Sequence, residues 1–176
     1  MNFDLDKAIE ILERTPKIMR AFLLDLSDDW IRINEGESTW TAYDVMGHLI
    51  HGEKTDWIPR TNMILSDKKN KTFEAFNRFA HFRTSKGKSM RDLLEEFEAL
   101  RTKNIAHLKS LRLTEKEFAL TGMHPALGEV TLKQLLAAWV THDLGHLAQI
   151  SRVMAKHYTE DVGPWYKYIN ILKDRL

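Results

Sequence analysis

Two histidines spaced four residues apart, His142 and His146, are the side chains best suited to chemistry in this sequence. They lie within residues 139–150, in a stretch that has the periodicity of a long helix. Because a helix turns by roughly 100° per residue, this spacing places both imidazoles on one face, one turn apart. The same face carries the apolar residues Leu132, Leu135, Trp139, Ile150 and Val153. The two histidines are therefore predicted to point into the protein interior.

Two inward imidazoles among apolar side chains need polar partners. A divalent metal ion supplies one bond to each, and nitrogen ligands suit borderline-soft ions. The natural third ligand comes from another helix of a bundle, and residues 45–52 offer His48 and His51. Spacing alone does not choose between these two. Gly52 lies one turn beyond His48 and has no side chain, so it would leave space beside an ion for water or substrate, which favours His48.

Four hydroxyl residues, each followed three positions later by an acid or a glutamine, predict where helices begin. The hydroxyl and the later side chain satisfy backbone donors that the first helical turn leaves unpaired. The pairs are Thr41 with Asp44, Ser89 with Asp92, Thr114 with Glu117, and Thr131 with Gln134.

Apolar periodicity predicts how far each helix runs. Residues 4–25 are expected to form two consecutive helices, because Pro16 suits a first helical position. The next helix is expected over residues 41–65, with a kink or interruption at Pro59. Two further long helices are predicted over residues 89–111 and about 131–158.

The predicted fold class is all-α, because the chain has no clean alternating β-branched run and no two-residue hairpin signal. Four long amphipathic segments favour an up-and-down four-helix bundle, with short accessory helices after Thr114 and Pro164. Residues 66–89 leave room for a longer crossing connection. A chain of 176 residues with 43% hydrophobic content has the usual size of one domain, so we expect a single bundle domain over residues 1–176.

Composition excludes several classes of function. The chain has no cysteine, so any metal must bind to nitrogen and oxygen ligands. Lys and Arg number 26 against 25 Asp and Glu, and the formal charge of +1 disfavours nucleic acid and anionic lipid as partners. No targeting segment and no run of about 18 apolar residues is present. We therefore expect a cytoplasmic protein that does not associate with membranes.

Several motifs together resemble the DinB superfamily, which includes the YfiT-like proteins, and the resemblance spans nearly the whole chain. The motifs are residues 38–41 leading into residues 47–53, the phenylalanine-rich crossing segment, residues 124–132, and residues 142–150. The resemblance implies a helical bundle with a three-histidine metal site, whose ligands fall on His48, His142 and His146. It makes His51 a neighbour of the site. It also implies frequent homodimerisation and, for some relatives, transfer of a low-molecular-weight thiol onto an electrophile.

Three protein ligands would leave an open coordination position, which is typical of a catalytic site. The expected function is that of a metal-dependent enzyme that activates a water or a small thiol, as a hydrolase or a thiol transferase acting on a small-molecule substrate. Zinc or nickel is the favoured ion, with iron or manganese as further options. The alternative is a non-catalytic metal-binding protein with a stress-response or interaction role, which an additional protein ligand closing the site would favour.

The sequence from His142 to His146 also resembles the metalloprotease signature His-Glu-x-x-His, in which the glutamate is the general base. Asp143 stands at that position here, and its shorter side chain reaches less far toward a bound water. Peptidase activity is therefore disfavoured, and we expect Asp143 to orient a ligand or to cap a surface contact.

Further candidates for the pocket, or for hydrogen bonds to the ligands, are His51, Asp143, Gln149 and His124. His124 could carry protons at the mouth of the pocket, although a turn position fixed by Pro125 is the favoured interpretation. His81, His107 and His157 have no partner at ligand spacing and are interpreted as surface or packing residues.

Two aromatic groups remain. Phenylalanines recur at every third position of the crossing segment, at Phe73, Phe76, Phe79 and Phe82. They could form a lid over the site, but we expect them to fix the segment onto the bundle. Trp165, Tyr166 and Tyr168 are expected to pack in the core or in a dimer interface.

Overall fold

Hydroxyl side chains cap the helices at the positions that the sequence predicts. The computed structural model describes residues 2–173, so residue 1 and residues 174–176 of the predicted domain lie outside the described residues. Reciprocal capping boxes precede α3 (Ala42–Thr55), α6 (Met90–Ser110), α7 (Glu115–Phe118) and α8 (Leu132–Lys156). These helix starts confirm the prediction made from the hydroxyl and acid or glutamine spacing.

The prediction of two consecutive helices within residues 4–25 is wrong. α1 (Leu5–Leu23) continues without a break through Pro16. Proline has no N–H to donate to the carbonyl four residues earlier, which is that of Leu12. Nη1 of Arg101, from α6, donates to this carbonyl at 2.8 Å. A tertiary contact thus satisfies the acceptor that Pro16 leaves vacant, which the local sequence does not reveal.

The long helix predicted over residues 41–65 is interrupted, as expected, although the break comes earlier than Pro59. α3 ends at Thr55 and α4 (Trp57–Leu65) begins two residues later. Pro59 therefore falls in the first turn of α4, where its missing N–H removes no helical hydrogen bond. Asp56 stands at the junction and forms a buried ion pair with Arg60.

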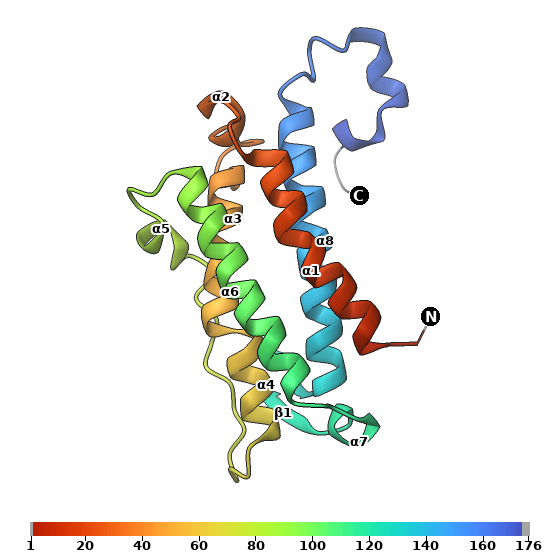
Figure 1. Ribbon diagram of the computed structural model, residues 1–176. Coiled ribbons are helices and arrows are strands. Elements are labelled where there is room, and N and C mark those ends of the chain that lie inside the picture. Colours follow the sequence, from red (N-terminus) through yellow and green to blue (C-terminus); the bar gives the residue numbers. More distant parts are fainter. Residues whose placement is uncertain (1, 174–176) are drawn as a thin grey trace.

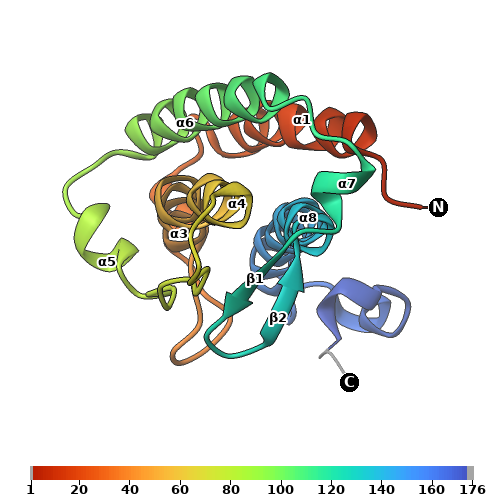
Figure 2. The ribbon, with the colours of Figure 1, turned by 90° about the horizontal axis from the view of Figure 1, so that it is seen from below.

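The long helices form a bundle of two layers. α1 and α6 lie side by side on one face, while α3, continued by α4, and α8 lie on the other (Figures 1 and 2). α1 and α8 run in one direction along the bundle, and α3 and α6 run in the other (Figure 1). The predicted four-helix bundle is confirmed, but the alternating up-and-down order is wrong. The connection between α4 and α6, which contains α5 (His81–Thr84), returns along the bundle before α6 begins.

A short antiparallel hairpin, for which the sequence shows no clear signal, precedes α8. β1 (Thr121–His124) pairs with β2 (Gly128–Thr131), and Thr72 of the crossing connection bridges to Met123. The loop has three residues rather than two, and each strand is too short to show a clear alternation. Gly128 adopts a φ of +78°, a left-handed conformation that glycine accepts without steric cost.

The remaining elements are short. They are α2 (Asp28–Ile31) and the 3₁₀ helices η1 (Gly163–Tyr168) and η2 (Asn170–Leu172). The prediction that the aromatic residues of η1 pack in the core is wrong, because Trp165, Tyr166 and Tyr168 are all exposed. The crossing-segment phenylalanines divide: Phe73 is buried, whereas Phe79 and Phe82 are exposed. Among residues 2–173, no helix has both the length and the apolar character needed to cross a bilayer.

A buried polar network joins three of the long helices. Arg101 of α6 forms ion pairs with Glu53 of α3, at 2.8 Å, and with Asp143 of α8, at 2.6 Å. Asn104 donates to Glu53 Oε2 at 2.9 Å, and Trp139 donates to Glu53 Oε1 at 3.1 Å. All five side chains are buried. Asp143 therefore caps no surface contact, which corrects one of the two roles expected for it.

We expect Arg101→Met to lower the free energy of unfolding by about 3–5 kcal/mol, because it leaves two buried carboxylates without their cation. Arg91→Met is the matched control, since it removes a solvent-exposed ion pair with Asp25. This control should change the free energy by less than about 1 kcal/mol. Urea unfolding followed by circular dichroism measures both values, and equal effects would contradict the importance of the network.

Candidate metal centre

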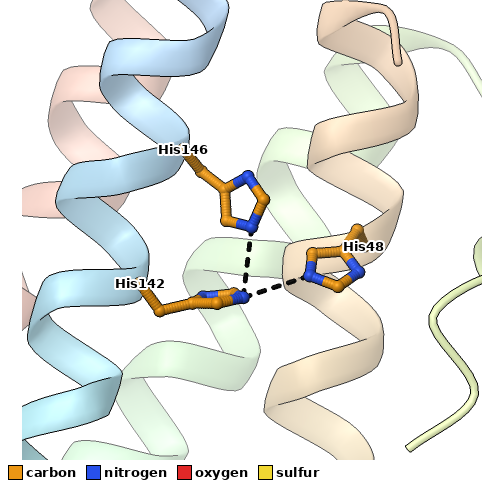
Figure 3. A group of neighbouring side chains, drawn as sticks. All are labelled: His48, His142 and His146. Atoms are coloured by element: carbon orange, nitrogen blue, oxygen red, sulfur yellow. Dashed lines mark hydrogen bonds between the residues drawn. The ribbon is translucent and has the colours of Figure 1, made fainter. Parts of the chain in front are cut away.

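Three imidazoles from two facing helices converge in the bundle interior. His48 comes from α3, and His142 and His146 come from α8 (Figure 3). Nε2 of His142 lies 3.1 Å from Nε2 of His48 and 3.1 Å from Nε2 of His146. One ligand nitrogen from each residue lies within 4.8 Å of the other two. His48 is buried, whereas His142 and His146 are half-buried.

The donor set fits a divalent transition-metal ion. Zinc binds imidazole nitrogen at about 2.0–2.1 Å, so tetrahedral ligand nitrogens stand about 3.4 Å apart. The Nε2 separations of 3.1 Å are close to this spacing. Without a cation, the Nε2 lone pairs of neighbouring rings would face and repel one another. At each contact, this repulsion is relieved only if one of the two Nε2 atoms carries a hydrogen. These three nitrogens could therefore hold one ion.

Burial keeps the imidazoles neutral, which is the form that binds a metal. Burial, together with the nearby rings of His146 and His142, lowers the pKa of His48 to about 2. Burial, with His146 and Arg101 adding to it, lowers the pKa of His142 to about 3. The pKa of His146 is also lowered by burial, although its hydrogen bond to Gln149 opposes this shift.

Gln149 fixes the orientation of one ligand. Its Oε1 lies 2.8 Å from Nδ1 of His146, and an amide oxygen can only accept. Nδ1 of His146 must therefore carry the proton, which leaves the Nε2 lone pair directed at the centre. The second nitrogens of His48 and His142 are buried with no hydrogen-bond partner within the described residues. Gln149 thus orients the ring of His146, which is one of the roles that the sequence suggested for it. The signal for this contact is the position of Gln149 three residues after His146.

Aromatic side chains wall the centre on the remaining sides. Trp40 lies 4.7 Å from the ring of His48, and Phe76 lies 5.3 Å from the same ring. Trp57 meets the ring of His142 edge-on at 5.1 Å. These apolar walls limit the access of water, and the crossing segment contributes one of them through Phe76.

The site opens on α8 rather than beside Gly52. A cavity of about 370 Å³ is lined by His142, Gly145, His146, Gln149 and Arg152. A Cβ atom added at Gly145 would meet nothing within 4 Å, so this position faces open space. A Cβ added at Gly52 would lie 3.2 Å from Nε1 of Trp57. The prediction that Gly52 leaves room for water or substrate is therefore wrong, because the indole of Trp57 fills that space.

The other pocket candidates lie outside the centre. His51 packs against Phe76 at 4.9 Å and does not join the three converging nitrogens. Asp143 turns to Arg101 in the buried network. Nδ1 of His124 accepts hydrogen bonds from the backbone N–H groups of Ala126 and Leu127. His124 is thus a residue of the hairpin turn, as the favoured interpretation expected.

His81 is also a neighbour of the site. From the sequence it is interpreted only as a surface or packing residue. Its side chain is 1% exposed, and neither ring nitrogen has a hydrogen-bond partner of good geometry in the part of the chain that the structure describes. The ring lies 4.8 Å from that of Trp40 and 6.0 Å from that of His48. Only the return of the crossing connection over α3 brings it there, so no spacing in the sequence signals this position.

Fold and site together define a class of helical-bundle proteins with three converging histidines on two facing helices. The model of the DinB superfamily matches residues 11–150, which include all three histidines. The chain therefore belongs to the DinB superfamily, as the resemblance in the sequence indicated. A comparison with curated proteins gave no match.

A solved structure of similar fold is that of YfiT from Bacillus subtilis. It superposes with a TM-score of 0.73 and 21% sequence identity, covering 86% of this chain and 86% of YfiT. YfiT is described as a probable metal-dependent hydrolase with an unusual four-helix bundle topology. At this identity the similarity establishes the fold alone. In this chain α3 and α6 run in the same direction, so its topology also differs from that of a simple alternating bundle.

We expect the metal-free protein to lose stability as the pH falls from 7 to 5. The folded-state pKa values of about 2 for His48 and about 3 for His142 lie below the ordinary value of 6.5. From about pH 6.5 downward the unfolded chain therefore binds more protons than the folded protein. The contribution of these two neutral histidines to the free energy of unfolding is therefore fully present above about pH 6.5 and is lost progressively below it.

The midpoint of urea unfolding, measured at pH 7, 6 and 5 in the presence of a chelator, tests this expectation. A double variant, His48→Gln with His142→Gln, should show a smaller decrease in the midpoint than the wild-type protein. An equal decrease in both proteins would mean that other groups cause the pH dependence.

Proposed function

We propose that this protein is a metal-dependent enzyme whose ion is held by His48, His142 and His146 and acts on a small molecule entering through the cavity along α8. The observation that carries the proposal is the position of this cavity, which borders two of the three converging histidines. Among residues 2–173, no fourth His, Cys, Asp or Glu joins the group. An open coordination position facing a cavity is the arrangement of catalytic rather than structural sites.

When bound, a divalent ion would supply a Lewis acid that lowers the pKa of a water or a small thiol. The residues of the chain would do the rest. Gln149 orients the ring of His146, while Trp57 and Trp40 exclude water from the closed sides. The cavity beside Gly145 admits the substrate. Hydrolysis and thiol transfer both follow from this arrangement, and they differ in which nucleophile is activated.

Zinc or nickel is the ion that we favour, because both accept neutral imidazole, with iron or manganese as alternatives. Homodimerisation, a cytoplasmic location and the absence of nucleic-acid and membrane partners stay predictions from the sequence. The second candidate function is a metal-binding stress-response or interaction protein without turnover. The exposed aromatic residues Trp165 and Tyr168 are the observation that favours an interaction role.

Replacement of one ligand tests the proposed site directly. We expect the wild-type protein to bind one divalent ion per chain, and His142→Ala to reduce the bound metal at least tenfold while the circular dichroism spectrum stays unchanged. His51→Ala is the matched control, because His51 lies one turn from His48 and outside the group. This control should retain wild-type stoichiometry in elemental analysis.

Retention of full metal content by His142→Ala would refute the site. Enzymatic function is tested separately, by screening the zinc- and nickel-loaded protein against ester, amide and thiol-acceptor substrates. Turnover that disappears with a chelator and returns with metal supports the enzyme. Metal binding without turnover of any substrate class would favour the non-catalytic alternative.

A further inference from the structure

The face of α8 that carries two of the histidines continues beyond His146 to a cationic side chain. Gln149 and Arg152 follow His146 at intervals of three residues, and such positions share one face of a helix. Both line the cavity of about 370 Å³ that borders His142 and His146. A molecule that entered this cavity would therefore meet the guanidinium of Arg152 as well as the three-histidine centre.

Arg152 has donor capacity that the described residues do not use. Its Nη2 donates to Glu35, in the loop between α2 and α3. Its Nε is buried and has no hydrogen-bond partner within residues 2–173. A guanidinium presents five N–H donors in a planar fork, and a buried donor without an acceptor is unfavourable. Because Nε is buried, an acceptor bound in the cavity would meet the guanidinium through the Nη N–H groups that Glu35 does not use.

The spacing along α8 limits the size of such a ligand. Arg152 lies six positions after His146, which corresponds to a rise of about 9 Å along the helix axis. Both side chains line the same cavity, so this rise sets the scale of the separation between them. The cavity therefore suits a small molecule with two ends, one at the histidines and one at Arg152.

We propose that Arg152 anchors the substrate, and that the substrate carries a carboxylate less than about 9 Å from its reacting group. A carboxylate matches the guanidinium fork and can accept two of its N–H donors. Arg152 is the single permanently charged residue among those that line the cavity, which suits a singly charged carboxylate better than a phosphate. The inference rests on the proposed function, because it assumes that the reacting end binds at the three histidines.

Binding of two matched series of probes to the cobalt(II)-loaded protein tests the inference. The probes are ω-mercapto carboxylic acids and ω-mercapto alcohols of equal chain length, and the thiolate-to-cobalt absorption band reports their affinity. We expect the wild-type protein to bind the acids about tenfold more tightly than the alcohols, because a charge-assisted hydrogen bond is stronger than a neutral one. The preference should be largest at a sulfur-to-carboxylate separation below about 9 Å.

Variants separate an anchoring role from a structural one. Arg152→Gln should abolish the preference for acids while its cobalt content and its affinity for the alcohols stay unchanged. Arg152→Lys should retain part of the preference. Glu35→Gln should retain or increase it, because the competing carboxylate is removed. Arg91→Gln is the control for loss of a surface guanidinium, and it should behave as the wild-type protein does.

Each outcome has a distinct meaning. Equal affinities for acids and alcohols in the wild-type protein would overturn the anchor but leave the proposed function intact, since thiols would still reach the metal. An equal loss of preference in Arg152→Gln and Glu35→Gln would show that the ion pair only holds the loop in place, which also overturns the anchor. Failure of cobalt to bind, or of every thiol to reach it, would contradict the proposed function and this inference together.

Discussion

One buried guanidinium holds the two helices that supply the histidines. Arg101 pairs with Glu53, five residues after His48 on α3, and with Asp143, which directly follows His142 on α8. Its Nη1 also reaches the carbonyl that Pro16 leaves without a helical donor in α1. Because buried charges are tolerated only when they are paired and hydrogen-bonded, this contact restricts how α3 and α8 can shift against each other. The 3.1 Å separations between imidazole nitrogens depend on that restriction.

The same network affects the electrostatics of the centre. Arg101 carries one positive charge against the two carboxyl groups of Glu53 and Asp143. Burial raises the pKa of Glu53, although Arg101 opposes the shift, so a proton on Glu53 can relieve the excess of negative charge. With both carboxylates ionised, the cluster beneath the histidines has a net negative charge that would favour a bound cation. The ion pairs of Arg101 thus connect the charge balance of this network to the two helices that carry the histidines.

The sequence predicts those features that depend on local spacing. The capping boxes at Thr41, Ser89, Thr114 and Thr131 mark helix starts, and the four-residue spacing of His142 and His146 places both rings on one face. Features that depend on contacts between distant segments cannot be predicted from the sequence in this way. The continuity of α1 requires Arg101, the filling of space at Gly52 requires Trp57, and the position of His81 requires the returning connection. The choice of His48 over His51 rests on the family resemblance, because their spacing does not decide it and the argument from space at Gly52 is wrong.

Different parts of α8 can therefore change independently. His142 and His146 sit between an inner face that binds Arg101 through Asp143 and an outer face that continues to Gln149 and Arg152. A substitution on the inner face disturbs the buried charges and hence the register of the ligand helices. A substitution at Arg152 alters only the wall of an open cavity and its contact with the Glu35 loop. In the proposed function the inner face must stay fixed while Arg152 contacts the substrate, so a change at Arg152 would alter which small molecule binds without moving the three histidines.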